Sequence, residues 1–277
     1  MKDRYLALSI PQDLQDPERQ PFLFREWFLG SHARKWIEYF KRPVEALEQL
    51  GVKPGHRVLD VGCDWGYTAM LLGSLGAKAY GIELDLISLR FGTRLIEANP
   101  GVGANLCCAN AVSLPFRSEQ FDHVTCIEAI EHFPREIRHS SISEMARCLK
   151  PGGRLVISTP NPRGIAEIGK RVLGCLQLLR RLSRHTIWKP SNVPWTPKGY
   201  MSSQVQVNDV VPKDEIERHC AGVGLRPVRA KYHLFLLKNT PNWAFMALRR
   251  ASQLAERLPL SNRFGATALY VYEKPVS

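Results

Sequence analysis

The sequence predicts an α/β fold built on a parallel sheet, and three observations support this prediction. Between residues 57 and 158, short runs rich in β-branched and apolar residues alternate with stretches long enough for a helix. A glycine-rich turn directly follows the first of these runs. The chain of 277 residues is 44% hydrophobic and 9% aromatic, which is typical of a packed globular protein and excludes disorder as its main state.

Apolar side chains at helical spacing over residues 22–50 predict helices that cover the sheet and form a lid over a substrate. The five strands predicted next are RVLDV, AKAYGIEL, ANLCCAN, FDHVTCI and GRLVIS. Further on, VPKDEIERHCAGVGLRPVRAKY predicts a helix, a glycine stop and a strand, and residues 267–274 predict the last strand. We therefore expect an N-terminal helical cap (1–50), a core (51–160), an insertion (161–207) and a C-terminal segment (208–277) that completes the sheet around a helical excursion.

Targeting and cysteine patterns favour a cytoplasmic protein. No stretch approaches the roughly 20 apolar residues needed to span a bilayer, and the first twenty residues contain acids and prolines where a secretory signal would be apolar. The seven cysteines include no C-x-x-C pair, so disulfides are not expected. Six cysteines lie in apolar segments and are predicted to be reduced core thiols: Cys63, Cys107, Cys108, Cys126, Cys148 and Cys175.

The positive charge is concentrated in one part of the chain. The net charge is +12, yet residues 1–160 hold 19 basic and 19 acidic side chains, whereas residues 161–250 hold 16 basic and 5 acidic ones, a net of +11. Such a localised charge favours an anionic partner, either a membrane surface, a nucleic acid or a phosphorylated substrate. The alternative is a solvated face that happens to be basic.

A glycine-rich turn joins the first predicted strand to a helix at Gly62-Cys63-Asp64-Trp65-Gly66. Such a turn lets a ligand approach the backbone, and the start of the helix offers free N–H groups to a negatively charged group. The second strand ends at Glu83, whose carboxylate could bind a ribose diol. The turn does not supply the G-x-G-x-x-G pattern of dinucleotide-binding proteins.

Five motifs in order, VLDVGCDWG, GIELD, NAVSLPF, FDHVTCIEAIEHF and LKPGGRLVISTPNP, resemble those of the class I S-adenosylmethionine-dependent methyltransferases over about residues 50–160. The resemblance implies a Rossmann-like, seven-stranded methyltransferase sheet. It also implies that the turn contacts the methionine part of the cofactor, the acid ending the second strand binds the ribose, and a pair after the third strand flanks the adenine. The implied cofactor-binding residues are Asp60, Gly62, Cys63, Asp64, Gly66, Glu83, Leu84, Asn110, Ala111 and Ile127.

Two positions depart from the family pattern. Asp64 stands where glycine is usual, which leaves open either a weakened cofactor affinity or a direct contact with the ammonium group. Asn110 stands where aspartate is commoner, although its carbonyl oxygen can still accept a hydrogen bond from the adenine amino group. A fold that no longer binds the cofactor, used as a non-catalytic assembly protein, is the alternative.

Acidic and histidine side chains cluster after the fourth predicted strand. If this segment is helical, Glu128, Glu131 and His132 lie on one face, where two carboxylates and an imidazole suit a divalent ion such as Mg²⁺, Mn²⁺ or Zn²⁺. The E-x-x-E-H pattern resembles that of the ubiquinone-biosynthesis O-methyltransferases and the small-RNA 2′-O-methyltransferases, and this resemblance implies His185 as a fourth ligand. Glu131 and His132 are the candidate catalytic residues, and without a metal His132 is the candidate base.

The insertion combines basic and apolar residues. Residues 161–189 contain seven basic side chains and one acid, and apolar residues recur at helical spacing within residues 164–182. This pattern predicts a basic amphipathic helix that lies on an anionic membrane, or one that packs on the sheet or in a dimer. We therefore expect methyl transfer to a small, lipophilic acceptor, with the oxygen of a phenol, catechol or quinol favoured. The alternatives are an RNA methyltransferase and the assembly protein.

Overall fold

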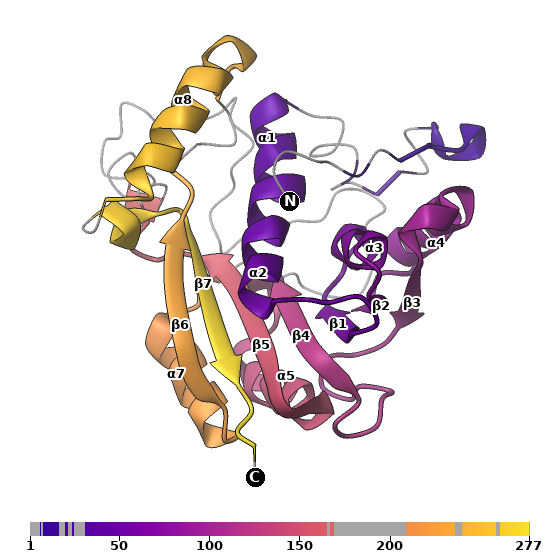
Figure 1. Cartoon of the computed structure of the whole chain (residues 1–277), viewed down its shortest axis with the longest axis vertical. Coiled ribbons are helices and arrows are strands. Elements are labelled where there is room, and N and C mark those ends of the chain that lie inside the picture. Colours follow the sequence, from indigo (N-terminus) through magenta and orange to yellow (C-terminus); the bar gives the residue numbers. More distant parts are fainter. Residues whose placement is uncertain are drawn as a thin grey trace.

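One seven-stranded sheet runs through the molecule (Figure 1). The computed structural model describes residues 6, 8–16, 20–21, 24, 31–164, 167–168, 209–235, 240–258 and 261–276. The strands are β1 (Arg57–Val61), β2 (Lys78–Glu83), β3 (Ala104–Cys108), β4 (Phe121–Ile127), β5 (Leu149–Pro160), β6 (Arg226–His233) and β7 (Thr267–Glu273). Their order across the sheet is β3-β2-β1-β4-β5-β7-β6, and β7 runs antiparallel to the other six described strands. The predicted seven-stranded α/β sheet is therefore confirmed.

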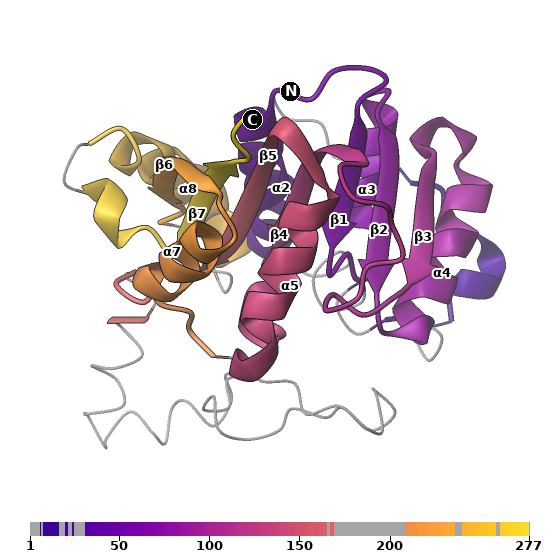
Figure 2. The ribbon, with the colours of Figure 1, turned by 90° about the horizontal axis from the view of Figure 1, so that it is seen from below.

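Helices cover both faces of this sheet (Figure 2). The longer ones are α2 (Arg42–Leu50), α3 (Tyr67–Ser74), α4 (Leu86–Ala98), α5 (Arg135–Cys148), α7 (Lys213–Gly222) and α8 (Asn242–Ala255). The helix α1 (His32–Trp36) continues through the π-helical turn η4 (Ile37–Lys41) into α2. Four single turns complete the described elements: η1 (Gln12–Leu14), η5 (Pro100–Val102), η6 (Ile130–His132) and η9 (Ser261–Phe264).

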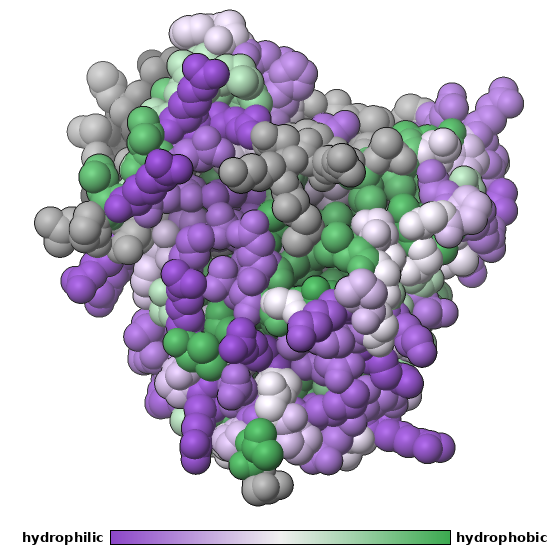
Figure 3. Space-filling model, viewed as in Figure 1, coloured by the Kyte–Doolittle hydropathy of each residue, from purple (hydrophilic) through white to green (hydrophobic). Residues whose placement is uncertain are grey.

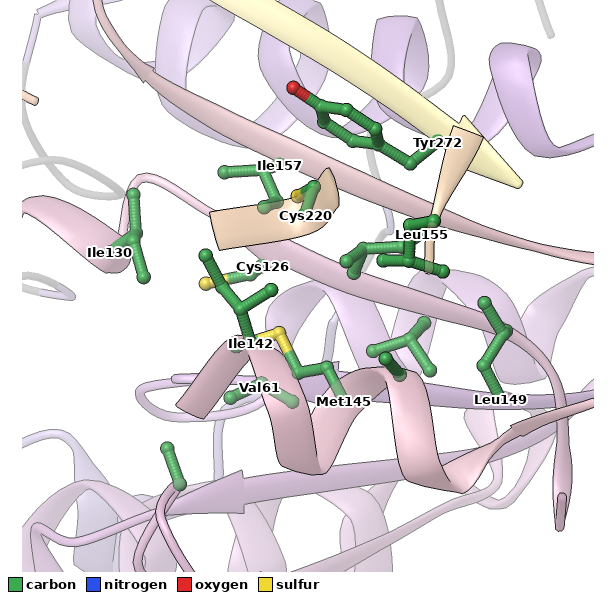
Figure 4. Packing of buried hydrophobic residues seen from close by; sticks show 14 of the residues in the cluster. Val61, Cys126, Ile130, Ile142, Met145, Leu149, Leu155, Ile157, Cys220 and Tyr272 are labelled. Atoms are coloured by element: carbon green, nitrogen blue, oxygen red, sulfur yellow. The ribbon is translucent and has the colours of Figure 1, made fainter. Parts of the chain in front are cut away.

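Apolar side chains form a separate core on each face of the sheet. On one face, Ile142 and Met145 of α5 and Cys220 of α7 pack against Leu155 and Ile157 of β5 (Figure 4). A second core lies on the opposite face and includes Trp36, Leu47, Leu72, Val156 and Val271. The helices at residues 32–50 thus lie on the sheet as the apolar pattern predicts: residues 36–47 are all buried, and α2 contacts β4 and β5.

The parallel strands direct their carboxyl ends to a single edge of the sheet. The residues after β1, β2, β4 and β5 therefore meet at this carboxyl edge, which is where ligands bind in open α/β sheets. The antiparallel β7 lies between β5 and β6, so that Ser158 faces Leu269 in the register. Every sequence-predicted site residue except His185 belongs to this edge or to the strands that form it, and His185 lies outside the described residues.

The cysteine prediction was only partly right. Cys63, Cys126 and Cys148 are buried thiols, as expected, but Cys107 and Cys108 are exposed. The reason is that β3 is an edge strand, with a neighbour on one side only. Cys175 and most of the insertion at residues 161–207 lie outside the described residues. Among the helices that are described, none has the length and apolar character needed to cross a bilayer.

Candidate cofactor and acceptor site

The turn after β1 is held tightly against its neighbours. The amides of Gly62 and Cys63 both donate to the carbonyl oxygen of Ile82, at 2.9 and 3.0 Å. Gly62 has a φ of +75°, and a Cβ added there would lie 2.5 Å from Cβ of Ala129. Gly66 ends the turn with a φ of +86° at the start of α3. The two glycines thus allow a conformation in which the backbone passes where a side chain would clash.

Asp60 lies inside the sheet. Its Oδ1 accepts a hydrogen bond of 2.8 Å from the Thr125 hydroxyl on β4, and only 2% of its surface is exposed. Burial raises the pKa of Asp60 to about 7. The side chain therefore ties β1 to β4 directly beneath the turn, and its predicted contact with a cofactor stays a prediction.

Glu83 joins the end of β2 to the turn after β1. Its Oε1 accepts hydrogen bonds from the amides of Leu84 (2.6 Å) and Asp85 (3.2 Å), and its Oε2 accepts one from the amide of Asp64 (3.2 Å). Burial raises the pKa of Glu83 above its usual range. A carboxylate has about four acceptor positions, so three bonds leave one on Oε2 for a ligand hydroxyl.

Asp64 occupies its glycine position by turning toward α4. It adopts a φ of +50°, and its Oδ1 accepts a hydrogen bond of 2.7 Å from the Ser88 hydroxyl. Burial raises the pKa of Asp64 to about 7. The sequence left two roles open for this residue, and the structure adds a third, a link between the turn and the first residues of α4.

The remaining residues implied for cofactor binding follow β2, β3 and β4. Leu84 and Ile127 are half-buried, and Ala111 is buried. Asn110 is exposed, and its Oδ1 accepts a hydrogen bond of 3.2 Å from the amide of Val112. This bond fixes the turn after β3 through the side-chain oxygen that the sequence assigned to the adenine amino group.

The cluster after β4 does not form the single helical face that the sequence predicted. Glu128 has a φ of +51°, outside the helical range, and the turn η6 begins only at Ile130. Glu131 is buried with 2% exposed surface, whereas His132 is exposed. The three side chains that the motif brings together in sequence therefore have different surroundings.

An arginine that the sequence analysis did not single out pairs with Glu128. The buried Arg42 contacts Glu128 Oε2 through Nη2 (2.8 Å) and Glu38 Oε2 through Nη1 (2.6 Å), and its Nε donates to Thr267 Oγ1 (3.1 Å). The other oxygen of Glu128 accepts a hydrogen bond of 2.7 Å from the Ser158 hydroxyl. The i,i+4 spacing of Glu38 and Arg42 could have indicated a pair within the helix, but no local pattern predicts the contact with Glu128.

The predicted metal set of Glu128, Glu131 and His132 does not match this arrangement. Both oxygens of Glu128 already have partners, one of them a guanidinium. Across the described part of the chain, no three His, Cys, Asp or Glu side chains form a group that could hold a metal ion. The described residues therefore do not support the predicted metal site, because the positive charge beside Glu128 belongs to Arg42.

Glu131 is a buried carboxyl group close to a carboxylate. Burial, and then the charge of Glu128, raise the pKa of Glu131 to about 8, while the charge of Arg42 acts in the opposite direction. A carboxyl group with a pKa near the working pH can both give and take a proton. The arrangement at the carboxyl edge thus combines a tight glycine turn, the carboxylate of Glu83 with one open acceptor position, and the buried carboxyl group of Glu131.

The comparisons with known proteins agree with this geometry. Residues 59–157 match the family described as "Methyltransferase domain". The ubiquinone biosynthesis O-methyltransferase of Xanthomonas campestris is 31% identical over 183 residues, which cover 56% of this chain and 74% of that protein. Its counterpart from Hahella chejuensis is 32% identical over 167 residues, covering 60% and 68%. For several other curated relatives, the match spans only about half of their length.

Solved structures share the fold at low sequence identity. A geranyl diphosphate methyltransferase in complex with S-adenosylmethionine superimposes with a TM-score of 0.53 at 19% identity, covering 87% of this chain and 89% of that one. The [4+2]-cyclase SpnF gives a TM-score of 0.57 at 17% identity, covering 87% and 83%. Such likeness concerns the fold alone. Together with the matched domain, the two O-methyltransferase relatives and the strand order, it shows that the chain belongs to the class I S-adenosylmethionine-dependent methyltransferases.

Proposed function

We propose that this protein transfers a methyl group from S-adenosylmethionine to a hydroxyl oxygen of a small, lipophilic acceptor of the phenol, catechol or quinol type. The observation that carries the proposal is the link between Glu83 and the glycine turn. One carboxylate accepts amide bonds from both Asp64 and Leu84, so the predicted ribose and methionine subsites form a single rigid unit. Several relatives are named for ubiquinone or demethylmenaquinone, which supports a quinol-type acceptor.

The cofactor is assigned to the carboxyl edge. The turn residues Gly62, Cys63, Asp64 and Gly66 would lie against its methionine part, with Asp60 beneath them. The open acceptor position of Glu83, beside Leu84, would take a ribose hydroxyl, and Asn110, Ala111 and Ile127 would surround the adenine. When bound, S-adenosylmethionine supplies an activated methyl group, and the protein aligns the acceptor oxygen with it and excludes water.

We assign the removal of the proton from the acceptor hydroxyl to the segment after β4. Glu131 is buried and its pKa is raised by that burial, and the exposed His132 follows it in η6. Arg42 and Ser158 hold Glu128, and this favours proton removal by Glu131 or His132 over activation by a metal on Glu128. His185 lies outside the described residues and stays a predicted ligand.

A membrane-delivered acceptor is the part of the proposal that depends on the insertion. The basic and apolar pattern of residues 161–189 supports contact with an anionic leaflet, at about 1 kcal/mol per Lys or Arg near the surface. A cytoplasmic protein bound peripherally to a membrane would agree with this pattern.

Calorimetric titration with S-adenosylhomocysteine tests the proposal. We expect the protein to bind it, and Glu83→Ala to weaken binding at least tenfold, about 1.4 kcal/mol, because the ribose contact is lost. Glu97→Ala is the matched control, since Glu97 is an exposed acid on α4 that pairs with Arg94. Circular dichroism must show that both variants fold.

Transfer of a labelled methyl group to catechols and quinols, with and without a chelator, completes the test. Activity that survives chelation supports side-chain catalysis by Glu131 or His132. Activity that needs Mg²⁺ or Mn²⁺ would instead support a metal-assisted reaction. Labelling of RNA in place of the small acceptors would favour the nucleic acid methyltransferase. If S-adenosylhomocysteine does not bind at all, the proposal is wrong and the assembly protein becomes the better hypothesis.

A further inference from the structure

The helix α8 exposes large apolar side chains on its outer face. Trp243 is 88% exposed, Met246 54% and Leu254 61%. At 100° per residue these three positions fall on one side of the helix, opposite Phe245 and Ser252, which are buried. The surface over α8, at the upper left of Figure 3, places hydrophobic residues beside strongly hydrophilic ones.

The inner face of α8 is fixed to the rest of the molecule. The rings of Phe245 and Trp36 meet edge to face at 6.1 Å, and the amide of His32 donates to Asn242 Oδ1 at 3.1 Å. The amide of Phe235 donates to the Ser252 hydroxyl at 2.9 Å. These contacts determine which side faces outward, so the exposure of Trp243 does not come from a loosely placed helix.

The exposed charged side chains of α8 and of the described residues just after it are positive. The helix sequence NWAFMALRRASQLA contains no acid, and Arg250 is exposed among the apolar residues. Arg257 follows seven residues later, just beyond the end of α8, and is also exposed. The nearby Glu256 points inward, where it pairs with Lys41 at 2.6 Å and accepts a hydrogen bond from the amide of Leu234 at 3.0 Å.

We propose that the outer face of α8 binds an anionic lipid bilayer, with Trp243, Met246 and Leu254 at the boundary between headgroups and acyl chains. Tryptophan is favoured at that depth, and arginines can reach the lipid phosphates while their stems cover apolar surface. In a symmetric dimer the same face would meet itself, which would bring Arg250 and Arg257 close to the same charges of the second copy. Charge complementarity therefore selects an anionic lipid surface over a second copy of the chain.

The position of α8 gives this contact a direction. The helix stands beside α1, at the end of the molecule toward which β5 runs, so it borders the carboxyl edge (Figure 1). Docking through α8 would bring this edge close to the bilayer. The inference deepens the proposed transfer to a lipophilic acceptor, but lipid binding itself does not depend on catalysis.

Flotation of the full-length protein with vesicles tests the proposal. The protein should float with an equimolar mixture of phosphatidylcholine and phosphatidylglycerol, and much less with phosphatidylcholine alone. Arg250→Gln combined with Arg257→Gln should weaken partitioning about thirtyfold. Arg117→Gln combined with Arg226→Gln removes the same charge from two exposed positions away from α8 and should change it little.

A second variant set tests the apolar contact. Trp243→Ser with Leu254→Ser should lower binding although every charge is kept, and the shift of tryptophan emission on adding vesicles should shrink in Trp243→Phe. Binding of S-adenosylhomocysteine shows that each variant is folded. If the wild type fails to bind it, the proposed methyl transfer is wrong, whereas the lipid-binding proposal is still tested by flotation.

Three outcomes would overturn the docking surface. The first is that the wild-type protein does not float with the vesicles. The second is that an α8 variant floats like the wild type, whereas neutralising four basic residues of the insertion releases the protein from the vesicles: Lys170, Arg171, Arg180 and Arg181. The third is a dimer in sedimentation that Trp243→Ser dissociates.

Discussion

Gly62 shows how one residue position shapes the candidate cofactor site. It combines a left-handed φ of +75° with a backbone that passes close to Ala129, in the segment leading to η6. The turn after β1 and the acceptor segment after β4 are thus in contact through a glycine. A side chain at position 62 would disturb both proposed subsites.

Gly62→Ala should destabilise the protein and weaken the binding of S-adenosylhomocysteine. The left-handed conformation costs about 1 kcal/mol or more for alanine, and the clash at 2.5 Å adds about 1–3 kcal/mol. Gly55→Ala is the matched control, because Gly55 has a φ of +85° but no atom within 4 Å of an added Cβ. Urea unfolding and calorimetry measure the two effects, and equal losses in both variants would show that the contact with Ala129 is unimportant.

At the scale of elements, Arg42 connects three parts of the chain. It lies at the start of α2 and reaches Glu38 in η4, Glu128 after β4 and Thr267 at the start of β7. Burial alone would lower the pKa of this guanidinium, but the carboxylates of Glu128 and Glu38 outweigh that effect and raise it. The helix α2 is thereby attached to the segment after β4 at the carboxyl edge.

Arg42→Met should lower the free energy of unfolding by about 3–5 kcal/mol, because the largely buried carboxylate of Glu128 would lose its counter-charge. Adding Glu128→Gln to this variant should recover part of the loss, since one uncompensated carboxylate is then removed. Chemical denaturation of the single and double variants measures both changes. A loss below about 1 kcal/mol, the range of exposed ion pairs, would mean that Arg42 is solvated in solution.

The elements were largely predictable from local patterns, whereas the acceptor side of the site was not. The runs RVLDV and FDHVTCI are β1 and β4 as the sequence predicted, because short, largely apolar runs favour buried parallel strands. The helical arrangement of Glu128 and His132 failed because Ser158 and Arg42, both distant in sequence, fix Glu128 in a left-handed conformation. The exposed cysteines of β3 were missed because an edge strand looks like an inner one in sequence.

At the scale of the whole molecule, buried acids at the carboxyl edge determine how stability changes with pH. Burial raises the pKa of both Asp60 and Asp64 from 3.8 to about 7. A group whose pKa is higher in the folded state contributes stability that is complete below its unfolded pKa and is lost as the pH rises through its folded pKa. His233 acts in the opposite direction, since burial lowers its pKa from 6.5 to about 3, so stability is lost as the pH falls across that range.

The ligand-free protein should therefore melt at a higher temperature at about pH 5 than at about pH 8. The carboxyl groups of Asp60, Asp64 and Glu131 outweigh the imidazoles of His233 and His123, although burial also lowers the pKa of His123 to about 4. Asp64→Asn should reduce this difference, since its amide oxygen can still accept the bond from Ser88 but no longer titrates. Scanning calorimetry across this range measures the effect. A melting temperature that rises toward alkaline pH would show that both aspartates are ionised in the folded protein.

The place of β7 between β5 and β6 also has a consequence for how the chain is made. Among the described strands β7 is the last to leave the ribosome, yet it provides the sheet neighbour of β6 and fills the gap beside β5. Until it emerges, β5 presents an unpaired edge, and β6 and α8 have no sheet to join. The nascent chain must therefore keep a half-built sheet from aggregating between the synthesis of β5 and that of β7, which makes the protein a candidate for chaperone protection until its final strand is inserted.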